Sequence, residues 1–209
     1  GMRFNWLFLN PVSYPGFSGS LYSVKDYYAF NPLFIDEKAG VSPTSQFGDM
    51  VRQAHRLGLR VMVDLVVNHT AVDCPLVEEH PDWYKRDSRG KIKNPGAWEG
   101  DKLVALWGDL AEIDNGNSPD RENLWEYWWQ LVQYWLGLGV DGFRCDAAYK
   151  VPAALWRMLI GRSRGIKPDT GWFAESLGCT IEDVVELAGA GFDYVFNSSK
   201  YWDWREDWC

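Results

Sequence analysis

Residues 60–67 read RVMVDLVV, a nearly continuous apolar run that contains one acid, Asp64, and is followed directly by Asn68 and His69. Such a run is typical of a strand that is buried on both faces, as strands are in a parallel sheet covered by helices. A carboxylate inside an apolar strand is costly unless a cation accompanies it. We therefore expect a buried parallel strand here, with a positively charged partner for Asp64.

Similar short runs alternate with helical patterns along the rest of the chain. The predicted strands are 4–9, 60–67, 140–145, 171–175 and 193–197, and the predicted helices are 43–57, 119–136 and 152–163. Ser42 and Ser118, each followed by proline, are the expected N-caps of the first two helices. A further short helix should begin at Thr180, which forms a capping-box pattern with Asp183. Residues 14–34 should form a long loop.

Alternating strands and helices predict an α/β fold with a parallel sheet. A closed barrel of this type has eight strands, and five are visible. We therefore expect an incomplete (β/α)8 TIM-barrel type domain over residues 1–209, with a small loop-rich excursion at 70–108. Gly1, before Met2, is interpreted as a tag remnant and excluded from this reasoning.

Composition narrows the possible ligands. The net charge of −8 argues against nucleic acid and anionic membranes as partners. No apolar run reaches the roughly 20 residues that a membrane helix needs. The chain has 13 Trp, 10 Tyr and 10 Phe, and such side chains suit the apolar faces and polar rims of sugar rings. Four irregularly spaced cysteines and the lack of a leader predict reduced thiols and a cytoplasmic location.

Acids occur at or near the ends of three predicted strands, where ligands of parallel β/α sheets bind. They are Asp64, Asp146 and Glu175. Strand alternation places Arg144 on the same face as Asp146, so that the guanidinium favours the ionised carboxylate and also reaches Asp64. The aromatic run before Glu175 favours its protonated form. One ionised and one protonated carboxyl group facing a common cleft are what glycoside hydrolysis requires.

Several segments resemble short motifs of the α-amylase superfamily of glycoside hydrolases, in the order that the family has. They are DLVVNH at 64–69, GFRCDAA at 142–148, FAE at 173–175, LWGDL at 106–110 and YSVKDYY at 22–28. The resemblance covers essentially the whole chain. It implies a partial catalytic barrel that cleaves α-glucosidic bonds in starch, glycogen or maltooligosaccharides by a retaining double displacement.

The resemblance also implies a role for each matching residue. The catalytic roles are Asp146 as nucleophile, Glu175 as general acid/base and Arg144 as the arginine that orients and ionises the nucleophile. The substrate-binding roles are Asp64 as a supporting acid, His69 and Tyr22 at the sugar that is cleaved, and Tyr149 and Lys150 on the acceptor side. Asn68 and Asp109 match calcium ligands, although calcium needs six or more oxygens. Tyr149 and Lys150 stand where many members have Lys-His, which puts the metal in doubt.

One family motif, which ends in His-Asp, is absent. The chain has three histidines, and they precede Arg56, Thr70 and Pro81. The sequence is therefore compatible with a fragment of a longer enzyme or with a natural truncation. The barrel would be completed by the remainder of a longer chain or by self-association. We expect little glycosidase activity from these residues alone. An α-glucan transferase and a non-catalytic glucan-binding fragment stay as alternatives. A nucleotide-binding α/β protein is disfavoured, because no glycine-rich phosphate loop follows a strand. No organic cofactor is expected.

Overall fold

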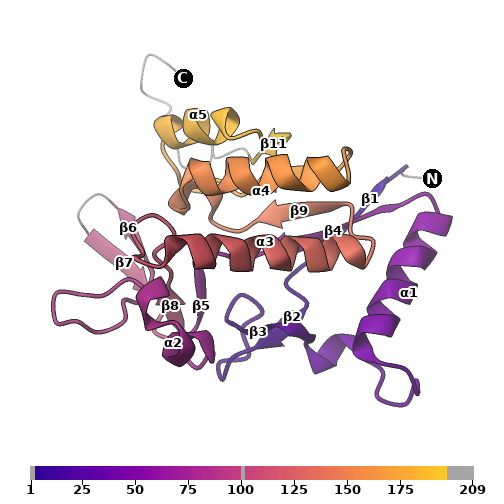
Figure 1. Ribbon diagram of the computed structural model, residues 1–209, viewed down its shortest axis with the longest axis horizontal. Helices are drawn as coiled ribbons and strands as arrows, with labels where there is room; N and C mark the ends of the chain where they lie inside the picture. Colours follow the sequence, from indigo (N-terminus) through magenta and orange to yellow (C-terminus); the bar gives the residue numbers. More distant parts are fainter. Residues whose placement is uncertain (1–2, 100–101, 197–209) are drawn as a thin grey trace.

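The computed structural model describes residues 3–99 and 102–196 (Figure 1). Its centre is a five-stranded parallel sheet in the order β1-β4-β9-β10-β11. The strands are β1 (Trp6–Leu9), β4 (Arg60–Leu65), β9 (Gly142–Cys145), β10 (Gly171–Ala174) and β11 (Tyr194–Val195). All five predicted strands are therefore confirmed, each shorter than its apolar run. The end of the last predicted strand, residue 197, lies outside the described residues, as does Gly1.

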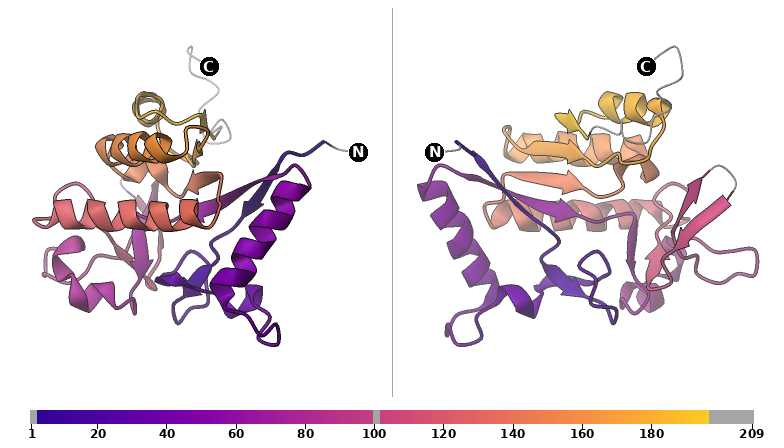
Figure 2. Two further views of the ribbon diagram at one scale, coloured as in Figure 1. Left: turned by 45° about the vertical axis from the view of Figure 1, so that its right-hand side comes forward. Right: turned by 180° about the vertical axis from the view of Figure 1, so that it is seen from behind.

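A helix connects each pair of neighbouring strands along the sheet. These helices are α1 (Pro43–Arg56), α3 (Arg121–Gly137), α4 (Ala153–Ile166) and α5 (Ile181–Gly189). Figure 1 shows α3 and α4 in front of the strands, and the view from behind in Figure 2 shows the strands in front of these helices. This layering is the one expected for part of a (β/α)8 barrel. In the described part of the chain, no helix is long and apolar enough to cross a membrane.

The two faces of the sheet differ in what they contain. Strand residues on the helix side are almost completely buried, and they include Val61, Val63, Phe143, Cys145, Trp172 and Ala174. On the other face Trp6 meets Phe173 edge to face, and Phe173 stacks on Tyr194 with ring centroids 4.8 Å apart. Gly142 makes room for this face, because a Cβ there would lie 2.7 Å from the Gly171 carbonyl oxygen and 3.1 Å from the Trp6 ring.

The predicted loop at 14–34 is wrong in part. Strand β2 (Ser13–Pro15) pairs antiparallel with β3 (Val24–Phe30), and a short 3-10 helix, η1 (Pro32–Phe34), follows. The pairing has register shifts at Tyr14, which explains why the sequence shows no clean alternation. The buried Tyr27 hydroxyl donates to the carbonyl groups of Val66 and His69 and so ties this ladder to the end of β4.

The second predicted helix start is also wrong. Helix α3 begins at Arg121, two residues after Pro119, and the Ser118 hydroxyl does not cap it. Instead the hydroxyl accepts from the backbone N–H of Asp120 and donates to the Asp82 carbonyl. The expected caps at Ser42 and Thr180 are confirmed, the latter as a complete capping box with Asp183.

The segment after β4 contains short elements where the sequence shows no periodicity. They are β5 (His69–Ala71), α2 (Leu76–Glu79), η2 (Pro81–Trp83), β6 (Gly96–Glu99), β7 (Lys102–Leu106) and β8 (Leu110–Glu112). Strand β5 pairs with β8, and β6 pairs with β7, both antiparallel. Figure 1 places these strands at one end of the sheet, beyond the end of β4. They form one wall of the candidate site described next.

Candidate active site

The three acids predicted from strand ends lie at one edge of the central sheet. Asp64 on β4 is the register partner of Arg144 on β9, and the last residue pair of β9 and β10 is Cys145 with Ala174. Asp146 and Glu175 each come one residue after that pair. Because the strands are parallel, their carboxyl ends meet at the same edge, and the side chains converge there.

Arg144 joins all three acids. Its Nη1 donates to both oxygens of Asp64 at 2.9 Å and to Oδ1 of Asp146 at 2.7 Å, and its Nη2 lies 3.9 Å from Oε2 of Glu175. The Arg144 side chain is 11% exposed and the Asp64 side chain is completely buried. The expected bridge between Asp64 and Asp146 is therefore confirmed. Both carboxylates bind the same guanidinium nitrogen, Nη1.

Burial dominates the electrostatics of this cluster. It raises the pKa of Asp64 to about 7; Arg144 opposes this shift and Asp146 adds to it. Burial also disfavours the charge on Arg144, but Asp64 and Asp146 outweigh that effect and hold the pKa of Arg144 above its usual value. The guanidinium therefore stays charged while Asp64 can take up a proton close to neutral pH.

Tyr22 and Asp64 are in direct contact. The Tyr22 hydroxyl donates to Oδ2 of Asp64 at 3.0 Å, and the Arg144 guanidinium lies 5.7 Å from the centre of the Tyr22 ring. Burial, followed by the charge of Asp64, raises the pKa of Tyr22. The Tyr22 hydroxyl therefore stays protonated and keeps its hydrogen bond to Asp64.

His69 has an unused donor at the site. Its Nδ1 lies 3.3 Å from the side-chain nitrogen of Asn68, which can only donate, so the neutral ring carries its hydrogen on Nε2. Burial lowers the pKa of His69 and favours this neutral form. Nε2 is buried, 4.0 Å from Oδ2 of Asp146, and has no hydrogen-bond partner among the described residues. An unpaired buried donor beside a carboxylate points to a ligand hydroxyl as its partner.

Backbone amides orient Glu175. Its Oε2 accepts from the N–H of Ala147 and its Oε1 accepts from the N–H of Leu177, both at 2.8 Å. Ala147 has a left-handed backbone, with φ at 44° and ψ at 43°, which is unfavourable for a residue other than glycine. This conformation turns the amide that follows Asp146 toward Glu175. The sequence gives no sign of it, because alanine does not mark such positions.

A pocket of about 1100 Å³ covers the edge where the acids meet. Eight of the ten site residues predicted from the sequence line it: Tyr22, Asn68, His69, Asp109, Asp146, Tyr149, Lys150 and Glu175. Arg144 and Asp64 are not among the lining residues; Arg144 contacts Asp146 directly, and Asp64 is connected to Asp146 through Arg144. Trp107 is a lining residue that the sequence analysis did not single out, although it is in a matched motif and 40% exposed.

Tyr149 and Lys150 form the wall of the pocket after the nucleophile candidate. Burial, with the charge of Glu175, raises the pKa of Tyr149 to about 12. Lys150 donates to the Gly96 carbonyl at 3.2 Å, and its ammonium lies 5.5 Å from the centre of the Trp107 ring. Burial lowers the pKa of Lys150. Lys150 thereby connects η3 (Ala148–Lys150) to the excursion across the pocket.

Asn68 and Asp109, the matches to calcium ligands, both line the active-site pocket. The carbonyl oxygen of Asp109 already accepts from the Val72 N–H and the Ser23 hydroxyl. Among the residues that the structure describes, no group of three or more His, Cys, Asp or Glu side chains is arranged to hold a metal ion. Calcium needs six to eight oxygen ligands, and two candidate side chains do not supply them.

The family model "Alpha amylase, catalytic domain" matches residues 1–164. The chain belongs to this family. Its fold is accordingly a partial (β/α)8 barrel, as predicted, with five of the barrel strands among the described residues.

Several relatives of this alpha-amylase domain are enzymes of different named activity. An alpha-1,4-glucan:maltose-1-phosphate maltosyltransferase of Burkholderia pseudomallei is 30% identical over 166 residues, which are 79% of this chain and 14% of that protein. Alpha-amylase 3 of Dictyoglomus thermophilum is 27% identical over 181 residues, which cover 78% of this chain and 34% of that protein. The chain thus spans about a third or less of these relatives.

Solved structures give the same family. The crystal structure of an alpha-amylase from Lactobacillus plantarum is 32% identical, with a TM-score of 0.75, and the match covers 93% of this chain and 45% of that chain. A maltogenic alpha-amylase from Thermotoga neapolitana is 29% identical with a TM-score of 0.73, over 96% of this chain and 42% of that one. This alpha-amylase domain therefore matches less than half of each solved chain.

Proposed function

We propose that the chain carries the catalytic residues of a retaining hydrolase of α-glucosidic bonds in starch-type glucans. One observation carries the proposal. Asp146 and Glu175 contact the same guanidinium and line the same pocket, which is large enough for a small ligand. Two carboxyl groups on one cleft are the requirement for glycoside hydrolysis.

In the first step Asp146 attacks the anomeric carbon and the glycosidic carbon–oxygen bond breaks. Oδ1 of Asp146 is held by Arg144, which leaves Oδ2, on the His69 side, as the attacking oxygen. Glu175 gives its proton to the departing sugar oxygen. Each Glu175 oxygen accepts one backbone N–H and keeps a second lone pair, so a proton can reside there without breaking either bond. The products are a glycosyl ester on Asp146 and a free sugar hydroxyl.

In the second step an oxygen nucleophile attacks the same anomeric carbon and releases Asp146. Glu175 takes the proton of that nucleophile and returns to its starting form. Attack by water gives hydrolysis, and attack by a sugar hydroxyl gives transfer. Tyr149 and Lys150 line the pocket beyond the nucleophile and would contact such an acceptor. Relatives of both kinds support both outcomes, and transferase activity is the second candidate function.

The test uses two substrates that differ in their leaving group, an aryl α-maltoside and maltotriose. Loss of a general acid matters less when the leaving group departs easily. We therefore expect Glu175→Gln to slow maltotriose cleavage far more than aryl maltoside cleavage. Asp146→Asn should abolish the reaction of both substrates. Release of the α-anomer, observed by NMR, is expected for a retaining reaction.

The same assay distinguishes a hydrolase from a transferase and from a non-catalytic glucan-binding domain. Added maltose should leave the product pattern unchanged for a hydrolase and should yield longer oligosaccharides for a transferase. Low activity is expected of these residues alone, so the deciding sample is a longer protein that includes a His-Asp motif. Binding of maltotriose by that protein with no reaction of either substrate, in wild type and Asp146→Asn alike, would favour a non-catalytic glucan-binding domain. Since both substrates share the second step, the comparison uses kcat/KM, which reports the first step. An equal fall of kcat/KM for both substrates in Glu175→Gln would contradict its role as the acid.

A further inference from the structure

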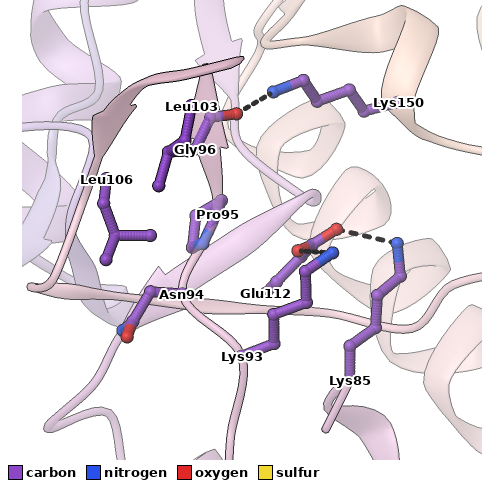
Figure 3. A pocket seen from close by; sticks show the side chains of 9 residues that line it. All are labelled: Lys85, Lys93, Asn94, Pro95, Gly96, Leu103, Leu106, Glu112 and Lys150. Atoms are coloured by element: carbon purple, nitrogen blue, oxygen red, sulfur yellow. Dashed lines mark hydrogen bonds and ion pairs between the residues drawn. The ribbon is translucent and has the colours of Figure 1, made fainter. Parts of the chain in front are cut away.

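A second pocket, of about 330 Å³, lies beside the candidate active site and shares Pro95, Gly96 and Lys150 with it (Figure 3). Most of its lining comes from the excursion after β4, and Lys150 reaches it from η3 on the barrel side. A group bound here can therefore belong to the same ligand as a sugar bound over Asp146. Nothing in the proposed mechanism uses this second pocket.

Three lysines and a single acid line the pocket. Lys85 lies 2.8 Å from Oε1 of Glu112, and Lys93 lies 3.1 Å from Oε2 of the same carboxylate. The third lysine, Lys150, donates to the Gly96 carbonyl and not to an acid. Figure 3 shows the three ammonium groups around the pocket with these contacts. The formal charge of the lining is therefore +2, in a chain whose net charge is −8.

The backbone fixes the positions of three of these residues. The N–H of Lys85 donates to the Glu112 carbonyl, that of Lys93 to the Lys85 carbonyl, and that of Glu112 to the Lys93 carbonyl, at 2.8–2.9 Å. This cycle of backbone bonds holds the segments together without the side chains. One lysine would be enough to neutralise Glu112, but both Lys85 and Lys93 contact this carboxylate, and Lys150 adds a third ammonium that contacts no acid in the lining.

The donors and the charge fit a phosphate group. Each ammonium has three N–H donors, and the contacts above use one donor on each lysine. A phosphate monoester carries a charge of about −1.5 to −2 at neutral pH, which matches the formal charge of +2 on the pocket lining. A carboxylate would neutralise only half of that charge. Leu103 and Leu106, 41% and 59% exposed, form an apolar wall beside the lysines, against which the flat face of a sugar ring can pack.

We propose that this pocket binds the phosphate of a phosphorylated glucan or sugar whose sugar part extends into the active-site pocket. The assignment rests on the proposed function, since it takes the larger pocket to be the sugar site. Lys85, Lys93 and Lys150 are the phosphate ligands, and Glu112 holds the first two lysines in place.

The test measures binding by titration calorimetry, with maltotriose, maltotriose phosphorylated on one hydroxyl, and inorganic phosphate as ligands. Wild type should bind the phosphorylated sugar at least tenfold more tightly than maltotriose, and added salt should reduce this advantage. Lys93→Met should remove most of the advantage and leave maltotriose binding unchanged. Lys93→Arg should retain it. Lys91→Met is the matched control, because Lys91 is in the same excursion but does not line the pocket.

The outcomes distinguish the two proposals. Binding of maltotriose without any gain from the phosphate would overturn the phosphate site and leave the glucan proposal intact. A gain that Lys93→Met and Lys91→Met reduce equally would also overturn it. Binding of inorganic phosphate that depends on Lys93, with no advantage for the phosphorylated sugar, would overturn the sugar-phosphate assignment. Failure of all sugars to bind would contradict the proposed function itself.

Discussion

Arg144→Met would leave two buried carboxylates without the cation that contacts both. The Asp64 side chain is completely buried and receives two 2.9 Å contacts from Nη1, and the Asp146 side chain is 13% exposed and receives one at 2.7 Å. Removing one partner of a buried ion pair costs about 3–5 kcal/mol. We expect the free energy of unfolding at pH 8 to fall by about this amount.

The loss of unfolding free energy in Arg144→Met should be smaller at acidic pH than at pH 8. The pKa of Asp64 is about 7 in the folded chain, above its unfolded value of about 3.9, so the folded state binds the proton more tightly. The stability from this proton is fully present below about pH 4 and is lost as the pH rises through about 7. Arg144 lowers the pKa of Asp64 in the folded chain, so without Arg144 the Asp64 carboxyl group should stay protonated to a higher pH. The variant should therefore approach wild-type stability near pH 5.

Arg144→Lys is the matched comparison. All three short contacts to Asp64 and Asp146 come from Nη1, so one ammonium at that position can serve both carboxylates. Lysine loses the second nitrogen, which lies 3.9 Å from Glu175. We expect the stability order arginine, lysine, methionine.

Urea unfolding followed by tryptophan fluorescence at pH 5 and pH 8 measures these differences. Far-UV circular dichroism of each variant checks that the secondary structure is retained. A methionine variant as stable as wild type at pH 8 would refute the ion-pair account. A loss of the same size at both pH values would refute the part assigned to the Asp64 proton.

Substitutions at three further positions test the packing around the site, each by its melting temperature and urea midpoint. Gly142→Ala should destabilise by about 1–3 kcal/mol, because its Cβ would press on the Gly171 carbonyl and Trp6. Gly161→Ala on α4, where a Cβ meets nothing within 4 Å, should instead stabilise by about 1 kcal/mol. Ala147→Gly should relieve about 1 kcal/mol of left-handed strain, whereas Ala147→Val should destabilise and impair any catalysis that depends on Glu175. Reversed signs in any of these comparisons would contradict the stated packing.

The central sheet was predictable because its strands are short apolar runs separated by helical patterns. Strand alternation alone could place Arg144 and Asp146 on one face, and the position of Asp64 on a neighbouring strand put it within reach of Arg144; the contacts agree with that placement. The end of β10 brings Glu175 to the same edge by the same rule of parallel strands. Local periodicity and topology therefore determine most of this site.

The features of the fold and the site that were not predicted from the sequence depend on contacts between distant segments. Strand β3 pairs with β2 through register shifts, and its Tyr27 is fixed by carbonyl groups at the end of β4, so no local alternation predicts it. The Ser118 hydroxyl binds the Asp82 carbonyl, 36 residues away, instead of capping α3. The left-handed Ala147 and the shared nitrogen of Arg144 are likewise results of tertiary packing. The second pocket depends on Lys150 meeting the excursion, which sequence spacing does not reveal.

The identity of the nucleophile can be measured directly by trapping the glycosyl intermediate. A fluorinated maltosyl fluoride carries a good leaving group, so the first step needs little help from Glu175, and the fluorinated sugar ester breaks down slowly. Intact-mass spectrometry of the reacted chain should show the addition of one fluorinated maltosyl group. Peptide mass spectrometry should place this group on the peptide that contains Asp146. Asp146→Asn should show none, and Glu175→Gln should still be labelled. A label on another residue, or a bound reagent that leaves wild type unlabelled, would contradict the assignment of Asp146 as the nucleophile.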